Sequence, residues 1–254
     1  MMNGKYVAVT KNCKIRPPNE VIFPILKQME DDSWRLIGTG FFITKHGIFL
    51  TAKHVLRDVL DSYTNEQTHP IVAMLFTSAT TYQIRRVTKG FLNVPGDIAA
   101  GVITNTDESG KLLGNGFYGL NRKPLLKGQE VHTYAYPKTI HNKNKINFHG
   151  NYYDGIIDEY LPTGRDCSML PNACYQTSMQ ILPGASGAPV FNSSGNVIGI
   201  NSSSFNDSTP PYVSFISCIT DAFGIVFEGI TLPCGYREYC TLEDLCNLGY
   251  VTTC

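Results

Sequence analysis

A glycine-rich segment with a serine at its centre is the strongest chemical signal in the chain. Residues 182–196 read Leu-Pro-Gly-Ala-Ser-Gly-Ala-Pro-Val-Phe-Asn-Ser-Ser-Gly-Asn, so Ser186 lies between Gly184 and Gly187. Such a loop can expose one hydroxyl and aim backbone N–H groups at a nearby oxyanion. The same residue types are also common in ordinary turns. Because an unassisted serine hydroxyl is a poor nucleophile, nucleophilic chemistry requires a base and an orienting acid elsewhere.

A histidine and an aspartate in the first half of the chain could supply these two groups. The run Thr51-Ala-Lys-His54-Val places His54 at the end of a predicted strand, and Gly96-Asp97-Ile-Ala-Ala-Gly-Val-Ile103 opens another strand with an acid. Taken alone, His54 could be structural or solvent-facing, and Asp97 could be a turn residue. The glycine-rich and apolar frame around them is more specific than either side chain.

The elements that must position these residues are short strands. Apolar runs separated by Thr, Asn, Gly and Asp favour a sheet or barrel over helices. We predict one set of strands at residues 21–28, 34–44, 48–52, 71–76, 82–87 and 98–103, and a second set at 129–136, 146–152, 175–181, 188–191, 197–201 and 212–219. The sequence therefore predicts an all-β fold of two packed six-stranded antiparallel β-barrels.

The remaining segments suggest the domain boundaries. We expect an N-terminal arm at 1–20, a first barrel at 21–110 that carries His54 and Asp97, a second barrel at 124–222 that carries Ser186, and a Cys-rich C-terminal tail at 223–254. The polar, glycine-rich stretch 104–123 is the best candidate linker. In the tail, Thr241-Leu-Glu-Asp244 is a capping-box signal that predicts a short C-terminal helix.

The order of the three candidate residues resembles that of the chymotrypsin-like (trypsin-like) serine proteases, a two-barrel family. His54, Asp97 and Ser186 follow one another at intervals of 43 and 89 residues. The motifs Thr-Ala-Lys-His-Val, Asp-Ile-Ala, Pro-Gly-Ala-Ser-Gly-Ala-Pro-Val-Phe and Asn-Val-Ile-Gly-Ile-Asn are most similar to those of the high-temperature-requirement-A type proteases and the glutamyl endopeptidases. The resemblance covers residues 21–222.

The resemblance implies a role for each residue. Ser186 would attack a carbonyl carbon, His54 would transfer the proton, and Asp97 would orient the imidazole and stabilise its charged form. The backbone N–H groups of Gly184 and Ser186 would form the oxyanion hole. This chemistry requires no cofactor and no metal.

Several positions depart from better-known relatives. Ala185 stands where the digestive enzymes carry an aspartate that pairs with a newly cut N-terminus, so activation by N-terminal insertion is not expected. Asn201 replaces the glutamate-reading histidine of the glutamyl endopeptidases, and Gln180 replaces the acid of trypsin. We expect a neutral substrate-binding pocket formed by Gln180, Ile181, Leu182, Asn201, Ser202, Ser203 and Ser204, with 202–204 pairing to the substrate backbone.

Composition narrows the function classes. Lys plus Arg and Asp plus Glu both number 21, so no basic surplus argues for nucleic acid or an anionic membrane. The chain begins without the apolar core of a secretory signal and contains no apolar run of membrane-spanning length, so we expect a cytoplasmic protein. The eight cysteines lack the paired spacing of a zinc site. They favour free thiols, with disulfides or an assembled metal site as alternatives.

The leading hypothesis is a serine endopeptidase that acts on protein or peptide substrates through an acyl-enzyme. The first alternative is a non-catalytic module of the same fold that binds an extended peptide or protein. A second alternative is an enzyme that stays inactive until a regulatory protein partner binds. The presence of all three residues, His54, Asp97 and Ser186, favours the first hypothesis, because a binding module has no need to keep them.

Overall fold

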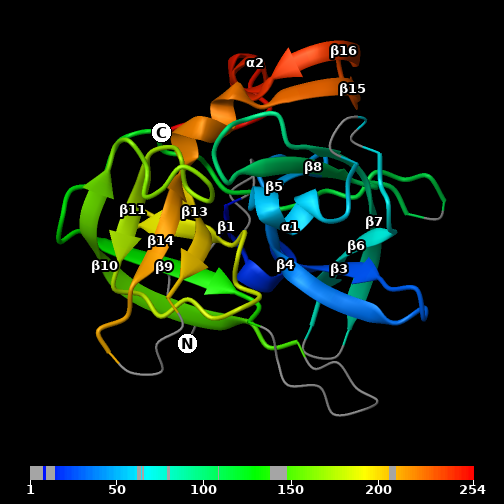
Figure 1. The fold of residues 1–254 in the computed structure, drawn as a ribbon. Helices are drawn as coiled ribbons and strands as arrows, with labels where there is room; N and C mark the ends of the chain where they lie inside the picture. The colour runs from blue at the N-terminus through cyan, green and yellow to red at the C-terminus, as the bar shows by residue number, and fades with distance from the viewer. Residues whose placement is uncertain are drawn as a thin grey trace.

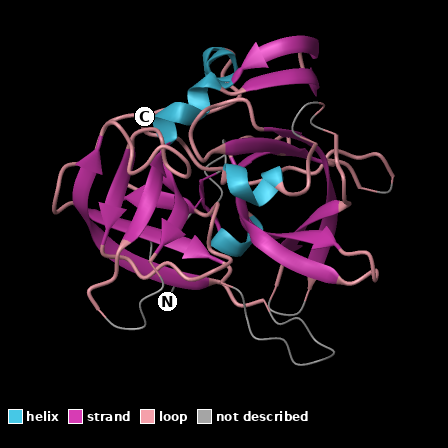
Figure 2. Cartoon of the chain, viewed as in Figure 1, coloured by secondary structure: helices cyan, strands magenta, loops and turns pink. Residues whose placement is uncertain are grey.

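Two closed six-stranded barrels lie side by side and make up most of the molecule (Figure 1). The structure, a computed structural model, describes residues 8–9, 15–61, 64, 66–78, 81–107, 109–137, 148–205 and 210–254. Strands dominate, and the few short helices lie between or beside the barrels (Figure 2). The predicted chymotrypsin-like fold of two antiparallel barrels is therefore confirmed.

The first barrel closes in the order β3-β4-β5-β8-β7-β6. Its strands are β3 (Ile22–Gln28), β4 (Trp34–Phe42), β5 (Ile48–Thr51), β6 (Ile71–Phe76), β7 (Tyr82–Phe91) and β8 (Ala99–Ile103), and the helix α1 (Lys53–Arg57) follows β5. Its interior is rich in aromatic rings. The ring of Phe23 packs against those of Phe42 and Phe49, with distances of 4.9 and 5.5 Å between ring centroids. These rings are fully buried, so this core holds the strands that end beside the candidate site.

The second barrel closes in the order β10-β11-β14-β13-β12-β9. Its strands are β9 (Glu130–Ala135), β10 (Asn151–Leu161), β11 (Cys174–Thr177), β12 (Pro189–Asn192), β13 (Val197–Ser204) and β14 (Ser214–Cys218). Residues 146 and 147 of the predicted strand at 146–152 lie outside the described residues. In the described part the predicted bounds are wrong, because β10 starts at Asn151 and ends at Leu161. Most β10 side chains are exposed or half-buried, so the strand lacks the apolar alternation that would reveal it.

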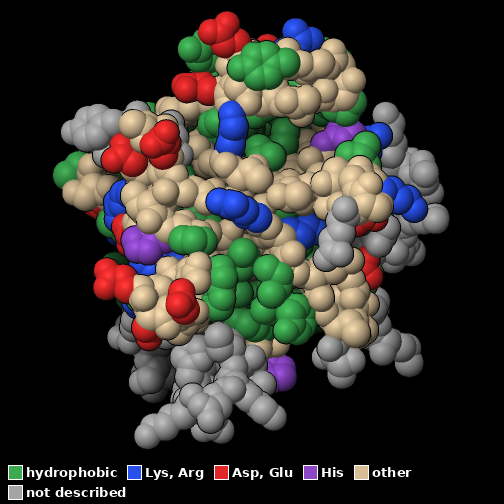
Figure 3. All heavy atoms as spheres, turned by 90° about the vertical axis from the view of Figure 1, so that its right-hand side faces the viewer, with side chains coloured by type: hydrophobic (Ala, Val, Ile, Leu, Met, Phe, Trp, Pro, Cys, Tyr) green, Lys and Arg blue, Asp and Glu red, His purple; other side chains and the backbone are tan. Residues whose placement is uncertain are grey.

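The outer face of the first barrel also carries apolar side chains. Leu26, Leu36 and Val72 form a small buried cluster, against which Trp34 and Met74 pack. The side of the molecule that Figure 3 shows has a hydrophobic patch below a band of Lys and Arg side chains. On β7, Tyr82 and Ile84 are exposed. The cluster of Leu26, Leu36 and Val72 shows that strands of this barrel bury apolar groups on the outer face as well as in the interior.

The C-terminal segment forms a hairpin and a helix that pack on the rest of the molecule (Figure 1). The 3₁₀ helix η3 (Ile219–Gly224) leads into β15 (Val226–Leu232), β16 (Gly235–Thr241) and α2 (Leu242–Asn247). Thr241 and Asp244 form the predicted capping box, so the C-terminal helix is confirmed. The hairpin was not predicted. Phe227, Leu242 and Leu245 are fully buried in the same core as the first barrel.

Part of the expected N-terminal arm is described. The two-residue strands β1 (Ala8–Val9) and β2 (Ile15–Arg16) pair with each other, and the 3₁₀ helix η2 (Pro18–Glu20) precedes β3. Residues 1–7 and 10–14, which include Cys13, lie outside the described residues. No helix in the described part of the chain is long and apolar enough to cross a membrane.

Candidate active site

The candidate base His54 is the second residue of α1. The residue before the helix, Ala52, has no side chain that could cap the first N–H groups. Asp97 Oδ1 instead accepts a hydrogen bond from the His54 backbone N–H at 3.0 Å. Free N–H groups at a helix start need such an acceptor. The aspartate that faces the histidine ring therefore also satisfies the start of its helix.

The ring of His54 points its Nδ1 at the same carboxylate. Nδ1 lies 3.0 Å from Asp97 Oδ1 and 2.9 Å from Oδ2. The Asp97 side chain is only 6% exposed, whereas that of His54 is 25% exposed. Because a carboxylate only accepts hydrogen bonds, the proton of a neutral imidazole lies on Nδ1 and leaves Nε2 free to accept another.

One further contact holds Asp97, and another holds the loop before it. Ser202 donates its hydroxyl to Asp97 Oδ2, and it lies where β13 bulges, between the residues that pair with Ile216 and Phe215. A bulge re-aims a side chain, which explains how Ser202 turns toward the acid. The Lys53 ammonium donates to the carbonyl oxygen of Val94 at 2.6 Å and ties α1 to the loop before Asp97. Burial lowers the pKa of Lys53.

The candidate nucleophile lies just after a tight turn. The Ala185 N–H donates to the Leu182 carbonyl oxygen at 3.1 Å, Pro183 is the second residue, and Gly184 has a φ of +93°. These are the features of a type II turn, whose third residue must accept a positive φ. Among the described residues, the N–H groups of Gly184 and Ser186 have no hydrogen-bond acceptor, so both are available to a substrate oxygen.

The Ser186 side chain is half-buried between the barrels. Its hydroxyl donates to the carbonyl oxygen of Ser202 at 3.2 Å rather than to the His54 ring. Hydrogen bonds of catalytic groups are often incomplete without substrate. Gly187, which follows, has a φ of +89°, and a Cβ atom on it would lie 2.1 Å from Thr51 Oγ1. The serine loop therefore contacts the first barrel directly.

The two walls of the expected pocket are joined by serine hydroxyls. The Ser204 hydroxyl donates to the Ile181 carbonyl oxygen at 2.7 Å. Ser214, on β14, donates to the Met179 carbonyl oxygen at 2.7 Å and accepts from the Ile181 N–H at 3.3 Å. A hydroxyl can bridge only walls that lie close together. These bonds hold Ser204 of β13 and Ser214 of β14 close to the segment 179–181.

The other predicted pocket residues have varied surroundings. Gln180 is half-buried, and the Leu182 side chain is 38% exposed. Asn201 is fully buried and donates its amide to Thr133 Oγ1 at 3.1 Å, so this amide group faces the barrel. Ser203 accepts a hydrogen bond from Arg165 at 2.9 Å.

Three residues that contact the candidate site were not predicted from the sequence: Thr39, Ser214 and Arg165. Thr39 hydrogen-bonds to the serine loop from β4, while Arg165 lies over the Phe215 ring, 4.7 Å from its centroid, and pairs with Asp166. Backbone N–H groups of Met169 and Ser168, together with Arg165, lower the pKa of Asp166. Thr39 had a usable signal, since it stands between two glycines in Gly-Thr-Gly. The other two had none.

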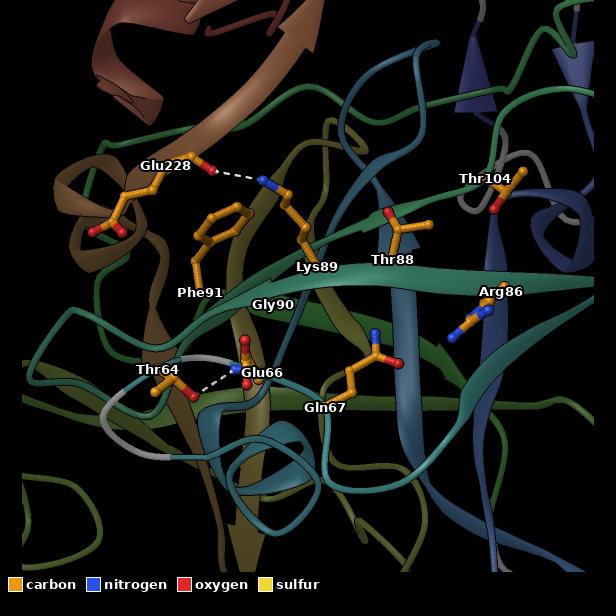
Figure 4. A pocket seen from close by; sticks show the side chains of 10 residues that line it. All are labelled: Thr64, Glu66, Gln67, Arg86, Thr88, Lys89, Gly90, Phe91, Thr104 and Glu228. Atoms are coloured by element: carbon orange, nitrogen blue, oxygen red, sulfur yellow. Dashed lines mark hydrogen bonds between the residues drawn. The ribbon is translucent and has the colours of Figure 1, made fainter. Parts of the chain in front are cut away.

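A cavity of about 690 Å³ lies away from these residues (Figure 4). Its lining comes from five residues of β7, from Thr64, Glu66, Gln67 and Thr104, and from Glu228 of the C-terminal hairpin. Lys89 Nζ donates to the carbonyl oxygens of Glu228 and Gly229 at 3.2 and 2.6 Å. Its lining includes none of the candidate site residues. The cavity therefore belongs to the joint between the first barrel and the hairpin.

The seven cysteines in the described residues are free thiols. Burial raises the pKa of Cys174 to about 11 and that of Cys218 to about 12, so both stay protonated near neutral pH. In the part of the chain that the structure describes, no group of three or more His, Cys, Asp or Glu side chains could hold a metal ion.

Comparisons with known proteins show the family to which the chain belongs. A family model described as a trypsin-like peptidase domain matches residues 38–200, a range that contains His54, Asp97 and Ser186. The protein "Uncharacterized protein y4bJ" of Sinorhizobium fredii (strain NBRC 101917 / NGR234) is 27% identical over 164 residues, which make up 64% of this chain and 21% of that protein. The chain therefore spans about a fifth of the length of this curated relative.

Solved structures share the fold. The HtrA-type protease AlgW with a tripeptide matches with a TM-score of 0.55 and 19% identity, over 80% of this chain and 57% of that chain. The active form of the Rv3671c protease from M. tuberculosis matches with a TM-score of 0.58 and 16% identity, over 80% of this chain and 78% of that chain. At these identities the likeness shows a common two-barrel fold.

Proposed function

The chain belongs to the trypsin-like peptidase family, and we propose that it is a serine protease that hydrolyses peptide bonds through Ser186, His54 and Asp97. The observation that carries this assignment is the histidine–aspartate pair. Asp97 holds both the backbone and the ring of His54, and the Ser186 loop leaves two N–H groups open to an oxyanion.

In the proposed reaction, Ser186 Oγ attacks the carbonyl carbon of the substrate while His54 Nε2 takes the hydroxyl proton. The tetrahedral oxyanion is bound by the N–H groups of Gly184 and Ser186. His54 then gives the proton to the leaving amine, and the carbon–nitrogen bond breaks to leave an acyl-enzyme. A water molecule, deprotonated by His54, releases the acid and regenerates Ser186. Asp97 stabilises the imidazolium at each stage.

We further propose that the substrate is an extended peptide or protein segment with an uncharged side chain before the scissile bond. Gln180, Ile181 and Leu182 would form one wall of its pocket, and β13 from Asn201 to Ser204 the other. An extended segment can pair with a strand through main-chain hydrogen bonds. The neutral hydroxyl of Ser204, which joins the two walls through the Ile181 carbonyl oxygen, supports this substrate class.

A second candidate is an enzyme that a protein partner activates. The observation that favours it is the Ser186 hydroxyl, which bonds to Ser202 instead of His54. A rotation of this side chain is needed before His54 can take its proton. Either the substrate or a partner protein could drive that rotation. In the first case the isolated protein reacts with substrate, and in the second it reacts only when the partner is present.

A fluorophosphonate probe that reacts with activated serines tests the proposal. Wild-type protein is expected to be labelled in the native state and not after denaturation, because only the folded site activates the hydroxyl. Ser186→Ala is expected to abolish labelling. Ser194→Ala is a matched control, since Ser194 is an exposed serine of the same segment, and it should be labelled like wild type.

The outcomes separate the candidates. Labelling that appears only with a partner protein would identify the partner-activated enzyme. A Ser186→Ala variant labelled as strongly as wild type would remove Ser186 from the mechanism. A native protein that is never labelled would leave the fold acting as a binding module.

A further inference from the structure

The buried threonine of β4 bonds to two parts of the serine loop. The Thr39 backbone N–H donates to the Ser186 carbonyl oxygen at 2.8 Å, and the Thr39 hydroxyl donates to the Gly184 carbonyl oxygen at 2.9 Å. Thr39 is fully buried. One residue of the first barrel therefore holds both ends of the segment from Gly184 to Ser186.

This segment contains the groups that the proposed oxyanion hole needs. The Ser186 N–H lies between the two carbonyls that Thr39 holds. The Gly184 N–H belongs to the preceding turn. The peptide group that ends this turn is held on both sides, because the Ala185 N–H donates to the Leu182 carbonyl oxygen and the Gly184 carbonyl oxygen accepts from Thr39. Movement of either carbonyl would change the direction of an oxyanion donor.

Thr39 is itself held firmly. Its hydroxyl accepts a hydrogen bond from the Tyr136 N–H at 3.2 Å, and its carbonyl oxygen accepts one from Thr51 Oγ1 at 2.7 Å. The neighbouring Gly38 permits the close approach, because a Cβ atom there would lie 2.5 Å from Val55 Cγ2 and 3.0 Å from the Ser186 carbonyl oxygen. The contact is thus a rigid joint between the two barrels.

The second barrel holds the loop after Ser186, where the Gly187 N–H donates to the Asn201 carbonyl oxygen at 2.8 Å, but the side chain of Ala185 has no polar group to anchor the loop. Ala185 is fully buried among Ile181, Ala188 and other side chains of the second barrel's core. Its methyl group stands where the digestive relatives place an aspartate that pairs with a new N-terminus. An ion pair of that kind cannot form at Ala185, so the loop must be held by other bonds.

We propose that Thr39 is the positioning residue that holds the oxyanion loop in its working conformation. This inference rests on the proposed serine-protease mechanism. The hydroxyl of Thr39 contributes the orienting hydrogen bond, and its backbone N–H contributes the anchor at Ser186. Thr39 touches neither substrate nor reacting atoms, and it acts through Gly184 and Ser186.

The variant Thr39→Val tests this assignment, because it keeps the shape and the backbone bond but removes the hydroxyl. We expect kcat on a cleaved peptide to fall by about ten- to a hundredfold with KM little changed, since a small misplacement of oxyanion donors affects the transition state most. The affinity for a peptide boronic acid, which mimics that state, should fall in parallel. Thr39→Ser should restore both.

A matched control is Thr177→Val. Thr177 is also fully buried, donates to the Ile156 carbonyl oxygen at 2.8 Å and accepts from the Met179 N–H at 3.3 Å, so it loses the same kinds of bond. It should lower Tm as Thr39→Val does, without the loss of kcat. If Thr39→Val does not fold, Thr39→Ala replaces it, because it removes the same hydroxyl.

Two results would overturn the role of Thr39 and leave the proposed function standing, provided that the wild type is active. One is a Thr39→Val variant that keeps the wild-type kcat. The other is a Thr39→Ser variant whose kcat is as low as that of Thr39→Val. A wild type that neither cleaves peptides nor takes up the fluorophosphonate probe would overturn the proposed function as well. Equal losses of kcat in Thr39→Val and Thr177→Val would assign Thr39 to general stability.

Discussion

Asp97 is the residue on which the contacts of the candidate site converge. Its carboxylate accepts from the backbone N–H and the ring of His54 and from the Ser202 hydroxyl. With these bonds a nearly buried carboxylate has little freedom to turn. His54 therefore keeps one ring orientation and one tautomer, which is what a general base requires.

Replacing Asp97 by asparagine should cost most of the activity. The amide keeps the size of the side chain but does not stabilise the imidazolium, so kcat is expected to fall by about 10⁴-fold, as in comparable triads. Steady-state kinetics on a cleaved peptide measure this. Asp154→Asn is the matched control, because Asp154 pairs with the ring of His132 at 2.8 Å. A kcat for Asp97→Asn equal to that of this control would contradict the role of Asp97.

The pocket depends on how three elements meet. β13 and β14 are joined to the segment 179–181 by the hydroxyls of Ser204 and Ser214. In the proposed pocket, these bonds would keep the walls together and place hydroxyls beside the substrate side chain. The pocket should therefore suit a short, uncharged side chain.

A series of peptides that differ only at the residue before the scissile bond tests this expectation. Wild type should have the highest kcat/KM for alanine, serine or valine. Ser204→Gly should raise kcat/KM for leucine by about tenfold or more, because room for one methylene is worth that much in an apolar pocket. A wild-type preference for arginine or phenylalanine would exclude a narrow neutral pocket.

The sequence was informative where the signal is local. The strand at 71–76 matches β6 in both bounds, and His54, Asp97 and Ser186 each stand in a short motif at a strand end. β10 was misplaced and the hairpin β15–β16 was missed, because β10 and β16 are mostly exposed and show little apolar alternation. The bond from Thr39 to Gly184 joins residues 145 apart. No spacing in the sequence predicts such a contact.

The C-terminal segment packs against the first barrel and is hydrogen-bonded to it. Asn93 exchanges two hydrogen bonds with the backbone of Val226, at 2.6 and 3.0 Å, and the Phe91 and Phe227 rings meet edge to face at 5.0 Å. Just before this segment, Asp221 packs on Gly96, beside the candidate acid. Asp221 Oδ2 is buried and has no hydrogen-bond partner among the described residues.

Asp221 should make stability depend on pH. Burial raises its pKa above the ordinary 3.8. A hydrogen bond with Asn172 lowers the pKa by a smaller amount. The folded chain therefore keeps this proton at a pH where the unfolded chain has lost it, so its contribution to stability falls as pH rises from about 4 through the folded pKa. Asp221→Asn should be more stable than wild type at pH 7.

Denaturant unfolding of both proteins at several pH values measures this difference. The advantage of Asp221→Asn should shrink as the pH is lowered toward 4, where the wild-type carboxyl is protonated in both states. An Asp221→Asn variant that is less stable than wild type at pH 7 would mean that the carboxylate is favoured in the folded protein.

The most direct test of the central claim is cleavage of a mixed peptide library, read by mass spectrometry of the new ends. The wild-type protein is predicted to hydrolyse peptide bonds that follow small uncharged residues, and Ser186→Ala is predicted to leave the library intact. Cleavage by Ser186→Ala at the wild-type rate would contradict the claim that Ser186 is the nucleophile.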